Sequence, residues 1–206
     1  MAILLSFHLF IALFFFNSAN RILWFDIALI VFTTAMFFIF ENRQYITTLD
    51  MMLRPKVSRK FNLIIAKYFA MVLFVLIFWI VLSSVYLLMS YIKLSDFSLY
   101  EVLLLQLLFL KPLVLLSIIF LFNTLKPNRL PLVLSSSLFL YSFVHFKGLI
   151  MKYPYIKYIV KFLPNFHLIN YEIIGSTVLN MVSTSYIMIA ILLGVTLYIS
   201  ESERWQ

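Results

Sequence analysis

The sequence predicts an all-α integral membrane protein with six transmembrane helices and a short cytoplasmic helix between the second and the third. The chain of 206 residues is 64% hydrophobic and only 12% charged, with a mean hydropathy of +1.05. This is more apolar surface than a water-soluble protein of this size needs. Several stretches also reach the roughly 18 apolar residues that a helix needs to cross a bilayer. We therefore expect a single transmembrane domain over 1–206.

The first two spans are expected at 2–16 and 22–40, with a tight turn at 17–20 between them. The second run is long enough to cross the bilayer. The first is short, because 15 residues of helix at 1.5 Å per residue reach only about 22 Å. Residues 2–16 therefore have an alternative placement as a helix lying in the membrane interface, which would reduce the count to five spans.

Residues 41–60, here called the polar loop, follow the second span and are rich in basic side chains. Their bases outnumber the two acids, Glu41 and Asp50, and are Arg43, Arg54, Lys56, Arg59 and Lys60. Such a cluster between two spans is typical of the cytoplasmic side. Apolar side chains recur there at helical steps of three and four, at Ile46, Leu49, Met52 and Leu53. Pro55 is expected to end this amphipathic helix.

The remaining spans follow from apolar runs and their breaks. They are expected at 61–92, 98–123, 130–147 and 179–200. Pro127 and Pro131 bracket the turn after the fourth span and prevent a continuous helix. Residues 148–178 form an outer linker in which Pro154, Pro164 and Gly175 divide the segment into short helices.

We expect the protein to lie in the inner membrane of a bacterial cell. Six spans would place both of its termini in the cytoplasm. Counts of basic residues support this orientation only modestly, because the outer connections hold nearly as many as the inner ones. The orientation therefore depends on the density of charge in the polar loop. Abundant Ile, Phe, Tyr, Asn and Lys with scarce Gly suggest an AT-rich bacterial gene.

Lys111, near the middle of the fourth span, is the strongest candidate for a functional side chain in the membrane. A charge at this depth costs about 2.5 to 3.5 kcal/mol on insertion scales, so it should face protein or water. We expect it either to line a central pathway or to pair with Asp26 or Glu101. The alternative is a displaced span from which Lys111 reaches the surface. For Asp26 itself, pairing with Arg21 is the favoured alternative.

Other polar side chains suggest structural roles. Polar side chains within the spans are expected to bond back to their own helices or to join helices. They are Ser83, Ser84, Gln106, Ser117, Ser135 to Ser137 and Ser183 to Ser185. His8, His145 and His167 lack the spacing of metal ligands, and the chain has no cysteine. No intramembrane His or acid pair appears at helical spacing, which disfavours a membrane-embedded enzyme. No phosphate-binding loop is visible, so any ATP would be hydrolysed by another chain. The net charge of +8 sits mostly in connections and suits lipid head groups rather than nucleic acid.

The polar loop resembles the loop after the second span in permeases of type-two ABC exporters. That loop reads roughly Glu, Gly-Thr-Leu-Glu, two leucines, Pro, a basic turn and Gly-Lys. The matching positions here are Glu41, Thr47 to Asp50, Met52-Leu53, Pro55, Ser58-Arg59 and Ala66-Lys67. Thr47 and Ala66 stand where the family has its two frequent glycines.

The resemblance implies a coupling helix that docks on a cytoplasmic ATPase. The residues it assigns to docking are Glu41, Ile46, Thr48, Leu49, Asp50, Met52, Leu53, Pro55 and Arg59. It also implies a second permease, identical or related, and two ATPase subunits that hold ATP and Mg, while this chain binds no cofactor. The expected cargo is hydrophobic or amphipathic, such as a bacteriocin, a cytolytic peptide, a drug or a lipid. The alternative is a membrane immunity or sensor protein that transports nothing.

Overall fold

The described part of the chain is helical except for a few linker residues. The computed structural model describes residues 21–42, 60–94, 99–125, 130–145, 163–164, 166 and 175–202. Its helices are α2 (Arg21–Asn42), α4 (Lys60–Leu94), α5 (Leu99–Leu108), α6 (Leu110–Leu125), α7 (Leu130–His145) and α10 (Gly175–Ser202). The expected span at 2–16, the amphipathic helix of the polar loop and most of the outer linker lie outside these residues.

Four helical stretches are long and apolar enough to cross a membrane, which is the character of a multi-pass membrane protein. They are Trp24–Glu41, Ile64–Ile92, Val102–Leu125 and Val178–Glu201, and α7 contributes a shorter apolar stretch at Leu130–Ser142. The helices begin and end within a few residues of the expected runs. The largest difference is at the N-terminal end of α10, which begins at Gly175 rather than at 179.

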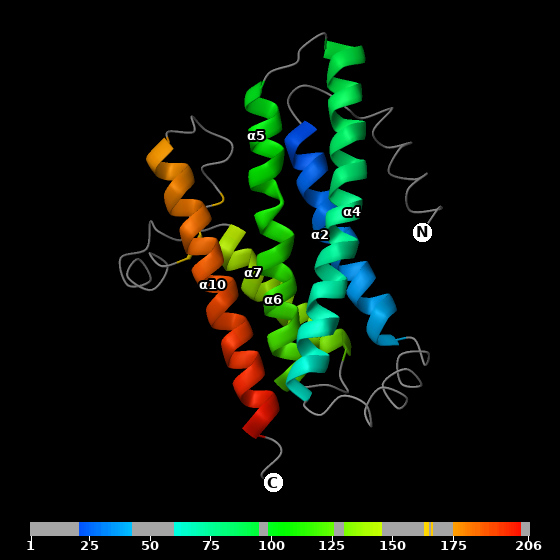
Figure 1. Ribbon diagram of the computed structural model, residues 1–206. Coiled ribbons are helices and arrows are strands. Elements are labelled where there is room, and N and C mark those ends of the chain that lie inside the picture. The colour runs from blue at the N-terminus through cyan, green and yellow to red at the C-terminus, as the bar shows by residue number, and fades with distance from the viewer. Residues whose placement is uncertain are drawn as a thin grey trace.

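The helices form an upright bundle (Figure 1). α2, α5 and α10 begin at its upper end, where α4 ends, and the last turns of α2, α6 and α10 lie at its lower end, where α4 begins. α6 is the centre of the bundle, because it packs against α2, α4, α7 and α10. Both ends of the polar loop and the end of the last helix therefore lie at the same end of the bundle.

The run expected as the fourth span, 98–123, consists of two helices, α5 and α6, with a break at Phe109. The Phe109 amide donates to the Gln106 carbonyl at 3.2 Å, a bond three residues back rather than four. Pro112 explains the break, because it has no N–H to give to the carbonyl of Leu108, and its ring collides with that carbonyl in a regular helix. The span expected at 98–123 is matched by one apolar stretch, Val102–Leu125, that contains this break.

Aromatic rings fill the contacts of α2, α4 and α6. Phe32 of α2 stacks on Phe78 of α4 with ring centroids 3.6 Å apart. Phe120 of α6 meets both Phe37 and Tyr68 edge to face, with centroids 5.7 and 5.4 Å apart. Edge-to-face contacts are favourable because the positive edge of one ring meets the negative face of another. These contacts fix the heights of the three helices relative to one another.

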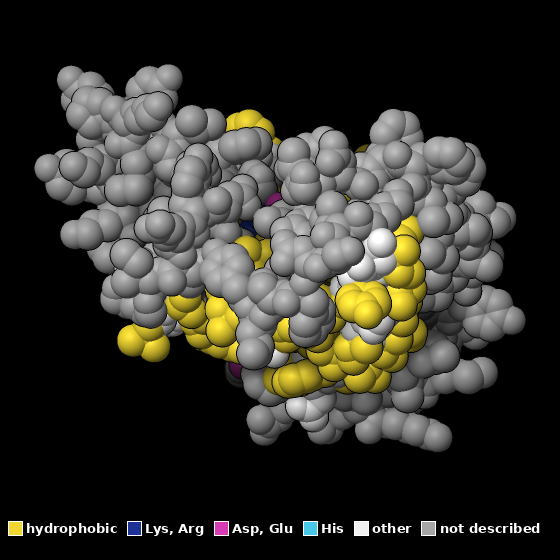
Figure 2. Space-filling model, turned by 90° about the horizontal axis from the view of Figure 1, so that it is seen from above, with side chains coloured by type: hydrophobic (Ala, Val, Ile, Leu, Met, Phe, Trp, Pro, Cys, Tyr) yellow, Lys and Arg dark blue, Asp and Glu magenta, His cyan; other side chains and the backbone are white. Residues whose placement is uncertain are grey.

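The outside of the bundle is apolar, as expected for helices in contact with lipid. Seen from above, the described side chains on the surface are mostly hydrophobic (Figure 2). α10 faces outward along most of its length, and its most exposed side chains are Leu179, Tyr186, Ile187, Ile191 and Tyr198. In contrast, most residues of α6 from Leu110 to Phe120 are buried.

Candidate functional site

A buried ion pair joins α6 to α2 inside the bundle. The Lys111 ammonium donates to the Asp26 carboxylate, with Nζ 2.6 Å from Oδ2. Each residue is only 4% exposed. Both charges are thus removed from solvent and held at the distance of a strong, charge-assisted hydrogen bond.

Two further segments contribute to the surroundings of this pair. The Lys111 ammonium lies 5.9 Å from the centre of the Phe166 ring, within the range of a cation–π contact. Phe166 belongs to the linker between α7 and α10 and is 2% exposed. Tyr141 of α7 is also buried, and α7 packs against α2, the helix that holds Asp26. Segments far apart in the sequence therefore converge on one acid and one base.

The pair decides among the alternatives for Lys111. Pairing with Asp26 is confirmed, and the surface-reaching alternative is wrong because the side chain is buried. The favoured alternative paired Asp26 with Arg21, but Asp26 has a partner on another helix, Lys111. The side chains of Arg21 and Glu101 lie outside the described part. Whether Lys111 lines a transport pathway stays a prediction.

Joining two helices through a buried ion pair costs free energy, because both charges lose their hydration. Removing both charges from water costs several kcal/mol per ion, and replacing such a pair by apolar side chains is often neutral or stabilising. Within membranes, ionisable side chains that face the bundle interior commonly mark a functional site. Because α2, α6, α7 and the linker meet here, we take Asp26, Lys111, Tyr141 and Phe166 as the candidate site.

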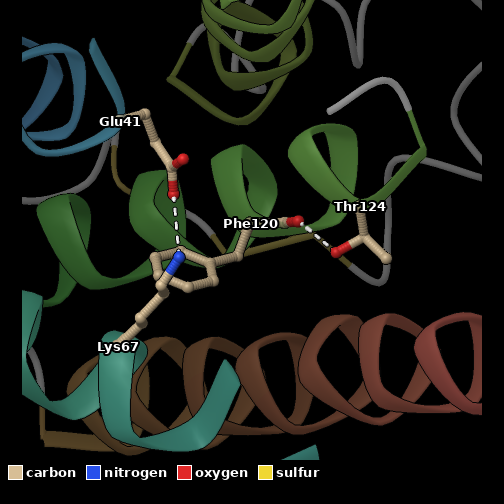
Figure 3. A network of polar contacts seen from close by, with 4 residues as sticks. All are labelled: Glu41, Lys67, Phe120 and Thr124. Atoms are coloured by element: carbon tan, nitrogen blue, oxygen red, sulfur yellow. Dashed lines mark hydrogen bonds and ion pairs between the residues drawn. The ribbon is translucent and has the colours of Figure 1, made fainter. Parts of the chain in front are cut away.

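A second polar contact closes the base of the polar loop. Glu41, at the end of α2, and Lys67, in the second turn of α4, point toward one another with Nζ 3.9 Å from Oε1 (Figure 3). Both side chains are about one quarter exposed, at 24% and 26%. Close by on α6, Thr124 donates to the carbonyl of Phe120 at 2.9 Å. Glu41 and Lys67 are separate positions of the loop motif, and the motif alone does not predict their contact.

The other expected docking residues lie outside the described part of the chain. They are Ile46, Thr48, Leu49, Asp50, Met52, Leu53, Pro55 and Arg59. Opposite charges at the two ends of a helix–loop–helix unit were the signal that could have predicted the contact between Glu41 and Lys67. No comparable local signal exists for Phe166 and Tyr141, because their positions depend on how the linker and α7 pack.

Hydroxyl groups inside the helices mostly bond to their own backbone, as expected. This is confirmed for Ser84, Ser117, Ser135, Ser137, Ser183 and Ser185. Ser117 also joins two helices, because its oxygen lies 2.9 Å from the Tyr68 hydroxyl. Since the Ser117 proton goes to the Leu113 carbonyl, Tyr68 is the donor in that contact.

Neither metal ligands nor relatives indicate a different site. In the ranges that the structure describes, no three His, Asp or Glu side chains gather as a metal site. Comparison of the chain with protein-family models, with curated proteins and with solved structures gives no match. The function of this chain is therefore inferred from its own residues alone.

Proposed function

We propose that the chain is the transmembrane subunit of an ATP-driven type-two ABC exporter in a bacterial inner membrane. In this proposal the unit has six spans, its termini are cytoplasmic, and it pairs with a second copy or a related permease. Two cytoplasmic ATPase subunits bind ATP and Mg, and the cargo is hydrophobic or amphipathic. The observation that carries the proposal is the motif of the polar loop, together with the contact that closes its base.

The contact between Glu41 and Lys67 suits a loop that transmits movement. It holds the end of α2 next to the beginning of α4, with its charged atoms 3.9 Å apart. A protein that pushes on the loop would therefore displace both helices together. α4 and α2 in turn pack on α6, the central helix, which holds Lys111. Movement of the loop would in this way reach the buried ion pair.

The first test is isolation of the chain from its own cell in mild detergent. We expect a cytoplasmic ATPase to be recovered with it in stoichiometric amount. Recovery of the chain without an ATPase, from cells in which it has been inserted intact, would favour a non-transporting immunity or sensor protein.

The second test concerns the amphipathic face of the polar loop. Changing Leu49 and Met52 together to Glu should abolish transport-coupled ATP hydrolysis while leaving the helices inserted, because two charges would replace the apolar docking face. The matched control changes Gln44 and Met51 to Glu, which adds the same charge to the loop at positions outside both the docking set and the loop motif. Full coupling in the first variant would refute docking through this face.

A further inference from the structure

The contacts of Lys111 show how an alkylammonium ion can be held within this bundle. The Lys side chain is a flexible four-carbon stem that ends in an ammonium group. Here the ammonium lies 2.6 Å from a carboxylate oxygen of Asp26 and 5.9 Å from the centre of the Phe166 ring. A carboxylate combined with an aromatic face is a recognition set for organic cations. Lys111 therefore occupies a site whose chemistry would fit a primary amine from another molecule.

The surroundings of the site favour a ligand with an apolar chain. Lys111, Asp26, Phe166 and Tyr141 are each no more than 4% exposed. The helix that holds Lys111 is otherwise lined by buried apolar side chains, among them Val114, Leu115 and Ile118. A molecule that reaches the carboxylate through this environment must present its charge at the end of an apolar body.

We propose that Asp26 and Phe166 form a binding site for the primary ammonium group of an amphipathic cargo, and that Lys111 is the resident occupant which the cargo displaces. Exchange of one ammonium for another keeps the Asp26 carboxylate paired, so no uncompensated charge is left in the bundle. The long stem of Lys111 allows its own ammonium to move to a hydrated face during the exchange. An anionic amphiphile would be repelled by Asp26, and a neutral one would not replace the positive charge that Lys111 supplies.

This inference names a cargo class and so extends the proposed export function, but the binding site can be tested without any ATPase. The first experiment uses the purified full chain with Lys111→Ala, which removes the stem and the ammonium. We expect n-butylammonium to raise the unfolding temperature of this variant by at least about 3 °C. Tryptophan fluorescence reports the unfolding. Butanol and butyrate are the matched neutral and anionic ligands and should have no such effect.

A second experiment avoids a variant that has lost only one of the two charges. Dodecylammonium should raise the unfolding temperature of the wild-type chain more than dodecanol does. The double variant Asp26→Asn with Lys111→Met, in which both charges are absent, should lose this preference. Lys67→Met, which removes a cation at the lower end of the bundle, should keep it.

The outcomes separate the two proposals. A wild-type chain that binds dodecylammonium no better than dodecanol, or a double variant that retains the preference, would overturn the ammonium site. If the preference depends on Asp26 but no ATPase is recovered with the chain, the site stands and the export function falls. In the complete complex, dodecylammonium should stimulate ATP hydrolysis, and the double variant should not respond.

Discussion

The indole of Trp79 donates to the backbone carbonyl of Leu105, with Nε1 2.9 Å from the oxygen. The donor is on α4, and the acceptor is in the last turn of α5, just before the break at Phe109. The Trp79 ring also packs against the Phe109 ring, with centroids 5.3 Å apart. α4 therefore braces the chain at the point where the proline interrupts the helix.

We expect Trp79→Phe to destabilise the protein by about 0.5–1.5 kcal/mol, the usual net contribution of one hydrogen bond. Phe keeps an aromatic ring against Phe109 but has no N–H for the carbonyl of Leu105. Trp79→Leu, which loses the ring contact as well, should cost more. Thermal unfolding in one detergent measures both variants, and equal stability of wild type and Trp79→Phe would show that the bond contributes nothing.

The ion pair predicts a strongly non-additive double-mutant cycle. Asp26→Asn and Lys111→Met should each cost about 3–5 kcal/mol, because each leaves one buried charge without its partner. The double variant should recover most of this loss, since both charges are then absent. Unfolding of the four proteins under identical conditions provides the coupling free energy. Additive losses would mean that the two side chains act independently.

Gly194 on α10 predicts a stabilising substitution. Apart from its chain neighbours and the backbone of its own helix, no heavy atom of the described chain lies within 4 Å of the position that a Cβ would take there. Gly194→Ala should therefore add stability of about 0.8–1.0 kcal/mol, the difference in helix propensity. Ala190→Gly, one turn earlier on the same exposed face, should remove a similar amount. A loss of stability in Gly194→Ala would reveal another chain packed against this face.

Hydrophobic pattern alone was sufficient to place the described helices. The runs at 22–40 and 61–92 appear as α2 (Arg21–Asn42) and α4 (Lys60–Leu94), because each is long, apolar and free of internal proline. The break between α5 and α6 was missed although Pro112 was visible. A proline inside a membrane helix is often accommodated by its neighbours, so its presence alone does not decide between a kink and a break.

The candidate site was only partly accessible from the sequence. The cost of a charge in the bilayer made Lys111 conspicuous and made Asp26 a plausible partner. The sequence alone does not select Asp26 over other acids as the partner of Lys111. That choice depends on the relative heights of α2 and α6, which the aromatic contacts fix. Phe166 could not be assigned at all, because a linker residue reaches the core only through the tertiary path of the chain.

Five hydroxyls along α10, those of Ser183, Thr184, Ser185, Thr196 and Ser200, donate to carbonyls of the same helix. The main packing partner of α10 is α6. Sliding or rotation of α10 along α6 therefore requires none of these five groups to change its partner, and exchanges one set of dispersion contacts for another. A change in the height of α10 against α6 would thus leave none of these five hydroxyls without its acceptor in the lipid.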